Sequence, residues 1–201
     1  AELLDRLTPD ELARVELLRG DSASMDFGLS GRRYLALAAS IDVVHHCAAV
    51  TYPGVARELA ERVNVGGTGE VLELVDASDR LRRLVYWSTT RVSGAREGRV
   101  HESELIRPAR FHNAVEETRF RAEAMVREAM ERVPTVILRS SNVVGDSHTG
   151  EIDRLEGPYL LILLMLSAPI DLRVPLPGRG DAPLNLVPID YVIDAGHAIA
   201  S

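Results

Sequence analysis

The sequence contains no lysine, and all 23 basic residues among its 201 are arginine. Because a guanidinium stays protonated at neutral pH, chemistry that requires a lysine Schiff base or a lysine general base is excluded. We interpret the bias mainly as the composition of a GC-rich genome. Acidic residues outnumber basic ones, and the net charge of −7 argues against nucleic acid or an anionic membrane as a partner.

Cysteine and long apolar runs are also scarce. The single cysteine, Cys47, excludes an internal disulfide framework and favours a cytoplasmic location, and no secretory signal is recognisable. The apolar run at residues 159–170 is shorter than the roughly 20 residues that span a bilayer, so we expect a buried helix there, with a membrane-touching patch as the less favoured interpretation. His45 and His46 lie in an apolar strand without ligand spacing, and no metal site is expected.

Strand-like and helix-like segments alternate along the chain. Short apolar runs predict strands at residues 15–18, 41–47, 84–88, 135–138 and 184–187. Helical periodicity predicts helices at residues 55–78, 114–131, 158–166 and 189–199. Gly66 and Gly67 lie inside the first of these helices, where they indicate close packing or a boundary between two pieces. Strands separated by helices are typical of a parallel sheet covered on both faces, so the sequence predicts an α/β fold.

Five short motifs occur in an informative order. They are Gly20-Asp21, Cys47-Ala48-Ala49, Asn64-Val65-Gly66-Gly67-Thr68, the segment 86–94 and the segment 139–145. On these motifs, the chain from about residue 15 to its end resembles an extended short-chain dehydrogenase/reductase of the thioester-reductase and fatty acyl-CoA reductase type. The resemblance implies a Rossmann-like, doubly wound, mainly parallel sheet. It also implies a partial NAD(P)-binding domain at residues 1–150, with a partial substrate-side region at 151–201 packed on it.

The resemblance implies that NADP or NAD is the cofactor. The residues that it assigns to cofactor binding are Asp21, Ala48, Ala49, Asn64, Ser140, Asn142 and Val143. Asp21 would accept a hydrogen bond from the adenine, although an Asx turn explains the same residue. Small side chains at Ala48 and Ala49 would let the dinucleotide lie against the backbone, although tight strand–helix packing explains them equally well.

The resemblance assigns the catalytic hydroxyl to Thr89, with Ser88 as the neighbouring candidate. A hydroxyl at this position would donate a hydrogen bond to a substrate carbonyl oxygen and polarise it. The alternative is a Ser/Thr-rich strand end that caps its own turn.

The family's Tyr-x-x-x-Lys pair is replaced by Val115 and Arg119. In the family, the tyrosine gives the proton and the lysine keeps it acidic. Valine has no proton to give, and arginine acts only as a fixed cation. Among nearby substitutes, His112, Glu116 and Tyr86, we favour His112, because helical spacing would place it on the same side as Val115.

A second departure is the missing nucleotide fingerprint. The family opens with a strand, a Gly-rich turn and a helix that holds the pyrophosphate, and no such motif precedes residue 15. The first two strands of a 3-2-1-4-5-6 sheet are therefore lacking, which leaves a gap of roughly 10–15 Å at about 4.8 Å per strand. Residues outside this chain would fill the gap, the strand at 15–18 would move beside the strand at 41–47, or the open edge would pair with another molecule.

Three functional hypotheses follow. The first is an NAD(P)H-dependent reductase of acyl thioesters or aldehydes, catalytically impaired in this chain. The second is a redox-silent binding or scaffold protein that acts through ligand or protein contacts, including a homo-oligomer or a partner chain that completes the sheet. The third is a decayed fragment without a role of its own. Val115 and the missing Gly-rich turn favour impaired catalysis.

Overall fold

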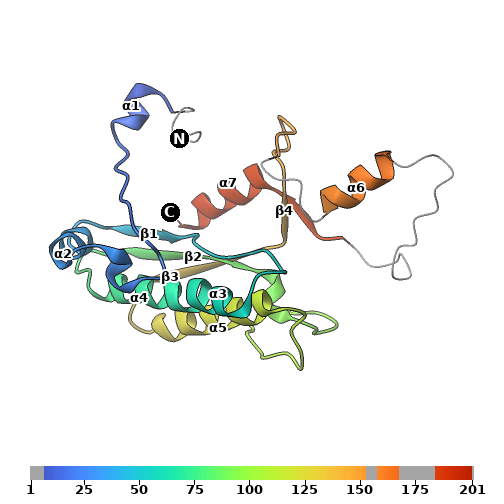
Figure 1. Ribbon diagram of the computed structural model, residues 1–201, viewed down its shortest axis with the longest axis horizontal. Helices are drawn as coiled ribbons and strands as arrows, with labels where there is room; N and C mark the ends of the chain where they lie inside the picture. The colour runs from blue at the N-terminus through green and yellow to red at the C-terminus, as the bar shows by residue number, and fades with distance from the viewer. Residues whose placement is uncertain (1–6, 153–157, 168–183, 201) are drawn as a thin grey trace.

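The computed structural model describes residues 7–152, 158–167 and 184–200. Its main sheet has three parallel strands in the order β1-β2-β3 (Figure 1): β1 (Val43–His46), β2 (Arg83–Thr89) and β3 (Thr135–Ser140). In the register, Tyr86 lies between His46 and Ile137, and the last residue of β2, Thr89, is opposite Ser140. The predicted α/β, Rossmann-like architecture is confirmed.

Helices cover the two faces of this sheet unequally. One face is covered by α3 (Arg57–Ala60), α4 (Gly67–Asp76) and α5 (Ala114–Ala129), and the other carries α7 (Ile189–Ala200) (Figure 1). The core lies on the better-covered face, because Leu84 and Tyr86 of β2 point toward α4 and α5 and are fully buried there with Val126. The remaining elements are α1 (Pro9–Leu12), η2 (Met25–Gly28), α2 (Gly31–Ala38), η3 (Glu61–Gly66), η4 (Thr90–Ser93), β4 (Asn142–Val144), α6 (Pro158–Ser167) and β5 (Leu186–Pro188).

The helix predicted at residues 55–78 is divided by the π-helical segment η3. Gly67 begins α4 directly after it and packs closely, since a Cβ atom there would lie 2.9 Å from the carbonyl oxygen of Ser22. Both roles proposed for a glycine at this point, a boundary and close packing, are therefore found at Gly67.

The strand predicted at residues 15–18 is wrong. These residues form no strand, and within the described residues nothing pairs with the outer edge of β1. An extended segment becomes a strand only when a neighbour takes up its backbone hydrogen bonds, and no strand among the described residues does so for residues 15–18. Movement of this segment beside β1, one of the three outcomes considered, is therefore not observed.

A second, two-stranded sheet joins β4 to β5 in parallel, with Asn142 opposite Leu186. It connects residues on both sides of the predicted domain boundary at 150, and the division into 1–150 and 151–201 stays a prediction.

Candidate active site

Thr89 and Ser140 lie side by side at the carboxyl ends of β2 and β3, where parallel sheets of this class bind ligands. Thr89 is half-buried, and its Oγ1 accepts a hydrogen bond from the backbone N–H of Arg91 at 3.3 Å. A hydroxyl that accepts a bond still has its own proton to donate. Thr89 can therefore cap the turn and also donate to a carbonyl oxygen, so the two interpretations of this residue are compatible.

Ser88 points to the opposite face, into a buried charge network. Its Oγ donates to Oε2 of Glu123 at 2.6 Å, and Glu123 has no solvent exposure. The same carboxylate accepts from Arg139 Nη2 at 2.6 Å and from Arg127 Nε at 2.9 Å. Burial alone would raise the pKa of Glu123, but the hydrogen bonds from Arg139, Ser88 and Arg127 outweigh it and hold that pKa below its ordinary value. The proton of Ser88 is thus committed to Glu123.

Val115 and Arg119 are both turned into the protein. They lie in the first two turns of α5, and their relative exposures are only 7% and 5%. Arg119 donates to the carbonyl oxygen of Trp87, and its guanidinium lies 5.2 Å from the centre of the Tyr86 ring. The cation therefore packs against β2, and no titratable group stands at position 115.

The interpretation of His112 as a residue of this helix is wrong. Helix α5 begins at Ala114, and Asn113 caps it by accepting from the N–H of Glu116 at 3.0 Å. His112 precedes the cap, so helical spacing says nothing about its direction. Its Nδ1 lies 2.8 Å from Oε2 of Glu116, and its side chain is half-exposed. Sequence reasoning overlooked the signal: Asn followed three residues later by Glu is typical of a helix start.

Tyr86 is enclosed by the core and has no path to the site. Its side chain has no solvent exposure, and burial raises its pKa above the ordinary value. A phenol that is both buried and less acidic does not replace a catalytic tyrosine.

The carboxyl end of β1 is open and lined by small side chains. Cys47 and Ala48 are exposed there, and Ala49 is half-buried. The loop is fixed by the fully buried Asn64, whose Oδ1 accepts from the N–H of Val50 at 2.8 Å and whose Nδ2 donates to the Val50 carbonyl at 3.1 Å. Accessible backbone with small side chains at this end of a parallel strand leaves room for a dinucleotide to approach.

The other proposed cofactor residues have local partners. Asp21 forms an Asx turn: its Oδ1 accepts from the N–H of Ala23 at 3.0 Å and its Oδ2 from Ser24 Oγ at 2.9 Å. These bonds, that from Ala23 foremost, lower the pKa of Asp21. Asn142 accepts from Arg91 Nη2 at 2.7 Å through Oδ1, and the neighbouring Val143 is exposed. Asp21 stays ionised and accessible, so the turn does not remove it from a ligand.

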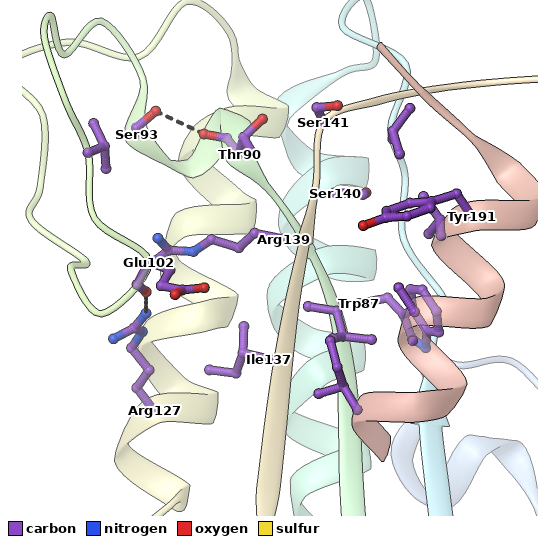
Figure 2. Close-up of a pocket in the computed structure, with 17 residues that line it drawn as sticks. Trp87, Thr90, Ser93, Glu102, Arg127, Ile137, Arg139, Ser140, Ser141 and Tyr191 are labelled. Atoms are coloured by element: carbon purple, nitrogen blue, oxygen red, sulfur yellow. Dashed lines mark hydrogen bonds between the residues drawn. The ribbon is translucent and has the colours of Figure 1, made fainter. Parts of the chain in front are cut away.

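A pocket of about 730 Å³ follows the outer edge of β3. Five consecutive residues, 137–141, line it, and since successive strand residues point to opposite faces, the pocket must run along the edge. Figure 2 shows Trp87 and Tyr191 on its α7 side and Arg127 on its α5 side. Ser140, which is opposite Thr89 in the strand register, also lines this pocket. The sequence motifs did not predict this pocket, because its walls come from segments that are far apart in the chain.

The two adjacent histidines have structural contacts. Nε2 of His46 lies 3.0 Å from Thr68 Oγ1, and Trp87 Nε1 donates to His45 Nδ1 at 3.3 Å. Burial, followed by the charge of Arg119, lowers the pKa of His46 to about 4.

Among the described residues, no helix has the length and hydropathy needed to cross a membrane.

Comparisons with known proteins identify the family of this chain. The profile of the NAD-binding family described as Male sterility protein matches residues 1–196. A linear gramicidin synthase from Brevibacillus parabrevis is 30% identical over 187 residues, which is 89% of this chain and 4% of that protein. Fatty acyl-CoA reductase wat from Drosophila melanogaster is 24% identical over 220 residues, covering 96% of this chain and 42% of that protein.

Among solved structures, the terminal R domain from the myxalamid PKS-NRPS biosynthetic pathway superposes with a TM-score of 0.84 at 28% identity, over 99% of this chain and 50% of that one. The chain thus spans half or less of each of these three proteins. The resemblance to the thioester-reductase and fatty acyl-CoA reductase type is confirmed. The chain belongs to the NAD-binding family described as Male sterility protein.

Proposed function

We propose that this chain forms the active-site part of an NAD(P)H-dependent reductase of acyl thioesters or aldehydes in which proton transfer is impaired. The observation that carries the proposal is Val115, a buried aliphatic side chain where the family has its proton-donating tyrosine. The membership of the family, and relatives named as a fatty acyl-CoA reductase and a carboxylic acid reductase, support the reaction class.

The dinucleotide, when bound, supplies a hydride. Thr89 donates a hydrogen bond to the carbonyl oxygen, and its acceptor bond from Arg91 fixes the direction of that hydroxyl. The oxygen that becomes negatively charged then has no side chain at position 115 from which to take a proton, so water must supply it. General acid catalysis contributes roughly 10²- to 10⁴-fold, and we assign a loss of this order to the chain.

For the cofactor, we propose a site whose nicotinamide half is built from residues 1–150, with the 151–201 region on the substrate side. Ala48 and Ala49 let the ring lie against the end of β1, Asn64 fixes that loop, and the residues Ser140, Asn142 and Val143 border the ring. Asp21 keeps an ionised carboxylate for the adenine amine.

The second candidate is a redox-silent binding protein, and the burial of Arg119 favours it. A cation directed at the Trp87 carbonyl does not reach a ribose hydroxyl in the crevice. In this case the open edge of β1 would pair with a partner chain or a second copy, and sedimentation at increasing protein concentration would detect self-association. The lone Cys47 leads us to propose a cytoplasmic location for either candidate.

NADPH titration followed by calorimetry separates the two candidates. The reductase-type site predicts saturable binding that Ala48→Leu weakens, because the larger side chain fills the open end of β1. Ala77→Leu, at an exposed position beyond α4, is the matched control and should bind as the original chain does. Absence of NADPH binding by the original chain would reject the reductase-type site and leave the redox-silent candidate.

A further inference from the structure

Arg91 is tethered at both ends beside the proposed carbonyl site. Its backbone N–H donates to Thr89 Oγ1 at 3.3 Å, and its Nη2 donates to Asn142 Oδ1 at 2.7 Å. The amide nitrogen of Asn142 in turn donates to the carbonyl oxygen of Asn185 at 3.1 Å. That second bond fixes the orientation of the amide with its oxygen toward Arg91, so the guanidinium is held in one place although the side chain is exposed.

The position of this guanidinium follows from the strand register. Thr89 at the end of β2 is opposite Ser140 at the end of β3. Arg91 is two residues beyond Thr89, and its partner Asn142 is two residues beyond Ser140. The side chain therefore bridges from the carboxyl end of β2 to the segment just after β3, at the end of the sheet where the two hydroxyls are paired.

The charge of Arg91 has no carboxylate partner within the described residues. By contrast, Arg127 and Arg139 both share Glu123. Asn142 is neutral and occupies one of the five N–H groups of Arg91, so the remaining donors and the full positive charge are available. In a protein of net charge −7, this is a localised cation at a proposed ligand site. A planar guanidinium recognises carboxylate and phosphate oxygens through paired hydrogen bonds.

Resting on the proposed function, we propose that Arg91 is a specificity-determining residue that selects thioester ligands carrying an oxyanion. That oxyanion is either a carboxylate on the acyl group or a phosphate on the pantetheine arm. Both present the same chemistry to the guanidinium, and the two sources are separated by the choice of probe.

Calorimetry with three synthetic thioesters tests this inference. Butyryl-pantetheine is neutral, succinyl-pantetheine adds a carboxylate to the acyl group, and butyryl-phosphopantetheine adds a phosphate to the arm. We expect one of the two anionic probes to bind about three- to tenfold more tightly than the neutral one, as one charge-assisted hydrogen bond at an exposed site allows. The preference should shrink as salt is raised.

Three variants assign the preference to Arg91. Arg91→Gln should abolish it, and Arg91→Lys should keep part of it because the charge remains. Arg82→Gln is the matched control: it removes the same charge from an exposed residue at the amino end of β2 and should leave the preference intact.

The outcomes also separate this inference from the function on which it rests. If all three probes bind equally, or Arg91→Gln keeps the preference, the reductase-type site stands and the role of Arg91 is wrong. If none of the probes binds, the proposed function fails and the inference about Arg91 fails with it.

Discussion

At the scale of single residues, Glu123 holds the site together. It receives hydrogen bonds from Ser88 on β2, Arg139 on β3 and Arg127 one turn further along its own helix. The two arginines also donate to backbone carbonyls of Ser103 and Glu104, which ties the loop after η4 to the same carboxylate. One buried charge therefore sets the spacing of α5, β2 and β3.

Replacing Glu123 with Gln should lower the free energy of unfolding by about 3 kcal/mol, because two guanidiniums would then share a buried site without a counter-charge. Urea unfolding at neutral pH measures the loss. Glu128→Gln, an exposed position on the same helix, removes the same charge and should change stability by less than about 0.5 kcal/mol. Equal effects of the two variants would show that the network does not hold the fold.

Motif spacing predicted the position of Thr89 at the end of a strand but not its neighbours. The pairing with Ser140 depends on strand register, and Glu123 meets Arg139 and Ser88 across 16 and 35 positions of sequence. Such contacts have no local pattern in the sequence. His112 is different, since the Asn113 cap was visible locally and was overlooked.

At the scale of elements, the two adjacent glycines where η3 meets α4 differ in the space around them. A Cβ on Gly67 would meet a backbone oxygen, that of Ser22, which cannot turn aside, whereas a Cβ on Gly66 would have its nearest neighbour at 3.9 Å. Both glycines have helical backbone angles.

We therefore predict opposite effects of alanine at these positions. Gly67→Ala should destabilise the protein by about 1–3 kcal/mol, because the loop that contains Ser22 must move. Gly66→Ala should stabilise it by up to about 1 kcal/mol through helix propensity. Thermal unfolding of both variants checks the signs. A gain in melting temperature for Gly67→Ala would contradict the close contact.

Local pattern predicted elements that carry their own periodicity better than elements that depend on a neighbour. The helices at 114–131 and 189–199 were found nearly to their ends because each has its own periodicity. The segment at 15–18 has the composition of a strand but lacks the neighbour that would make it one. The composition of a segment indicates that it can be extended, whereas strand formation also requires a neighbouring strand with which to pair.

At the scale of the whole molecule, the fold should be sensitive to mild acid through His46. Its side chain is 3% exposed, and burial lowers its pKa from 6.5 to about 4. Below about pH 6.5 the imidazole of His46 binds a proton in the unfolded chain but stays neutral in the folded one. The free energy of unfolding therefore decreases as the pH falls from about 6.5 toward about 4, by up to about 3 kcal/mol. Carboxylates with lowered pKa, such as Glu123, lose their contribution only at more acidic pH.

Urea unfolding across this pH window measures the effect. His46→Gln should be less stable at neutral pH but should lose much of the decline between about pH 6.5 and 4.5. His101→Gln, at an exposed position, should keep it. If the free energy of unfolding of His46→Gln falls with pH as steeply as that of the original chain, another group causes the acid sensitivity.

The central claim is that this chain lacks the proton donor of its family at position 115. The most direct measurement is the rate of NADPH-dependent reduction of butyryl-pantetheine by Val115→Tyr/Arg119→Lys and by Val115→Phe/Arg119→Lys. These variants differ by one hydroxyl, so packing costs cancel in the comparison. We predict that the tyrosine variant is about a hundredfold faster and that the original chain is as slow as the phenylalanine variant. A rate for the original chain equal to that of the tyrosine variant would contradict the account.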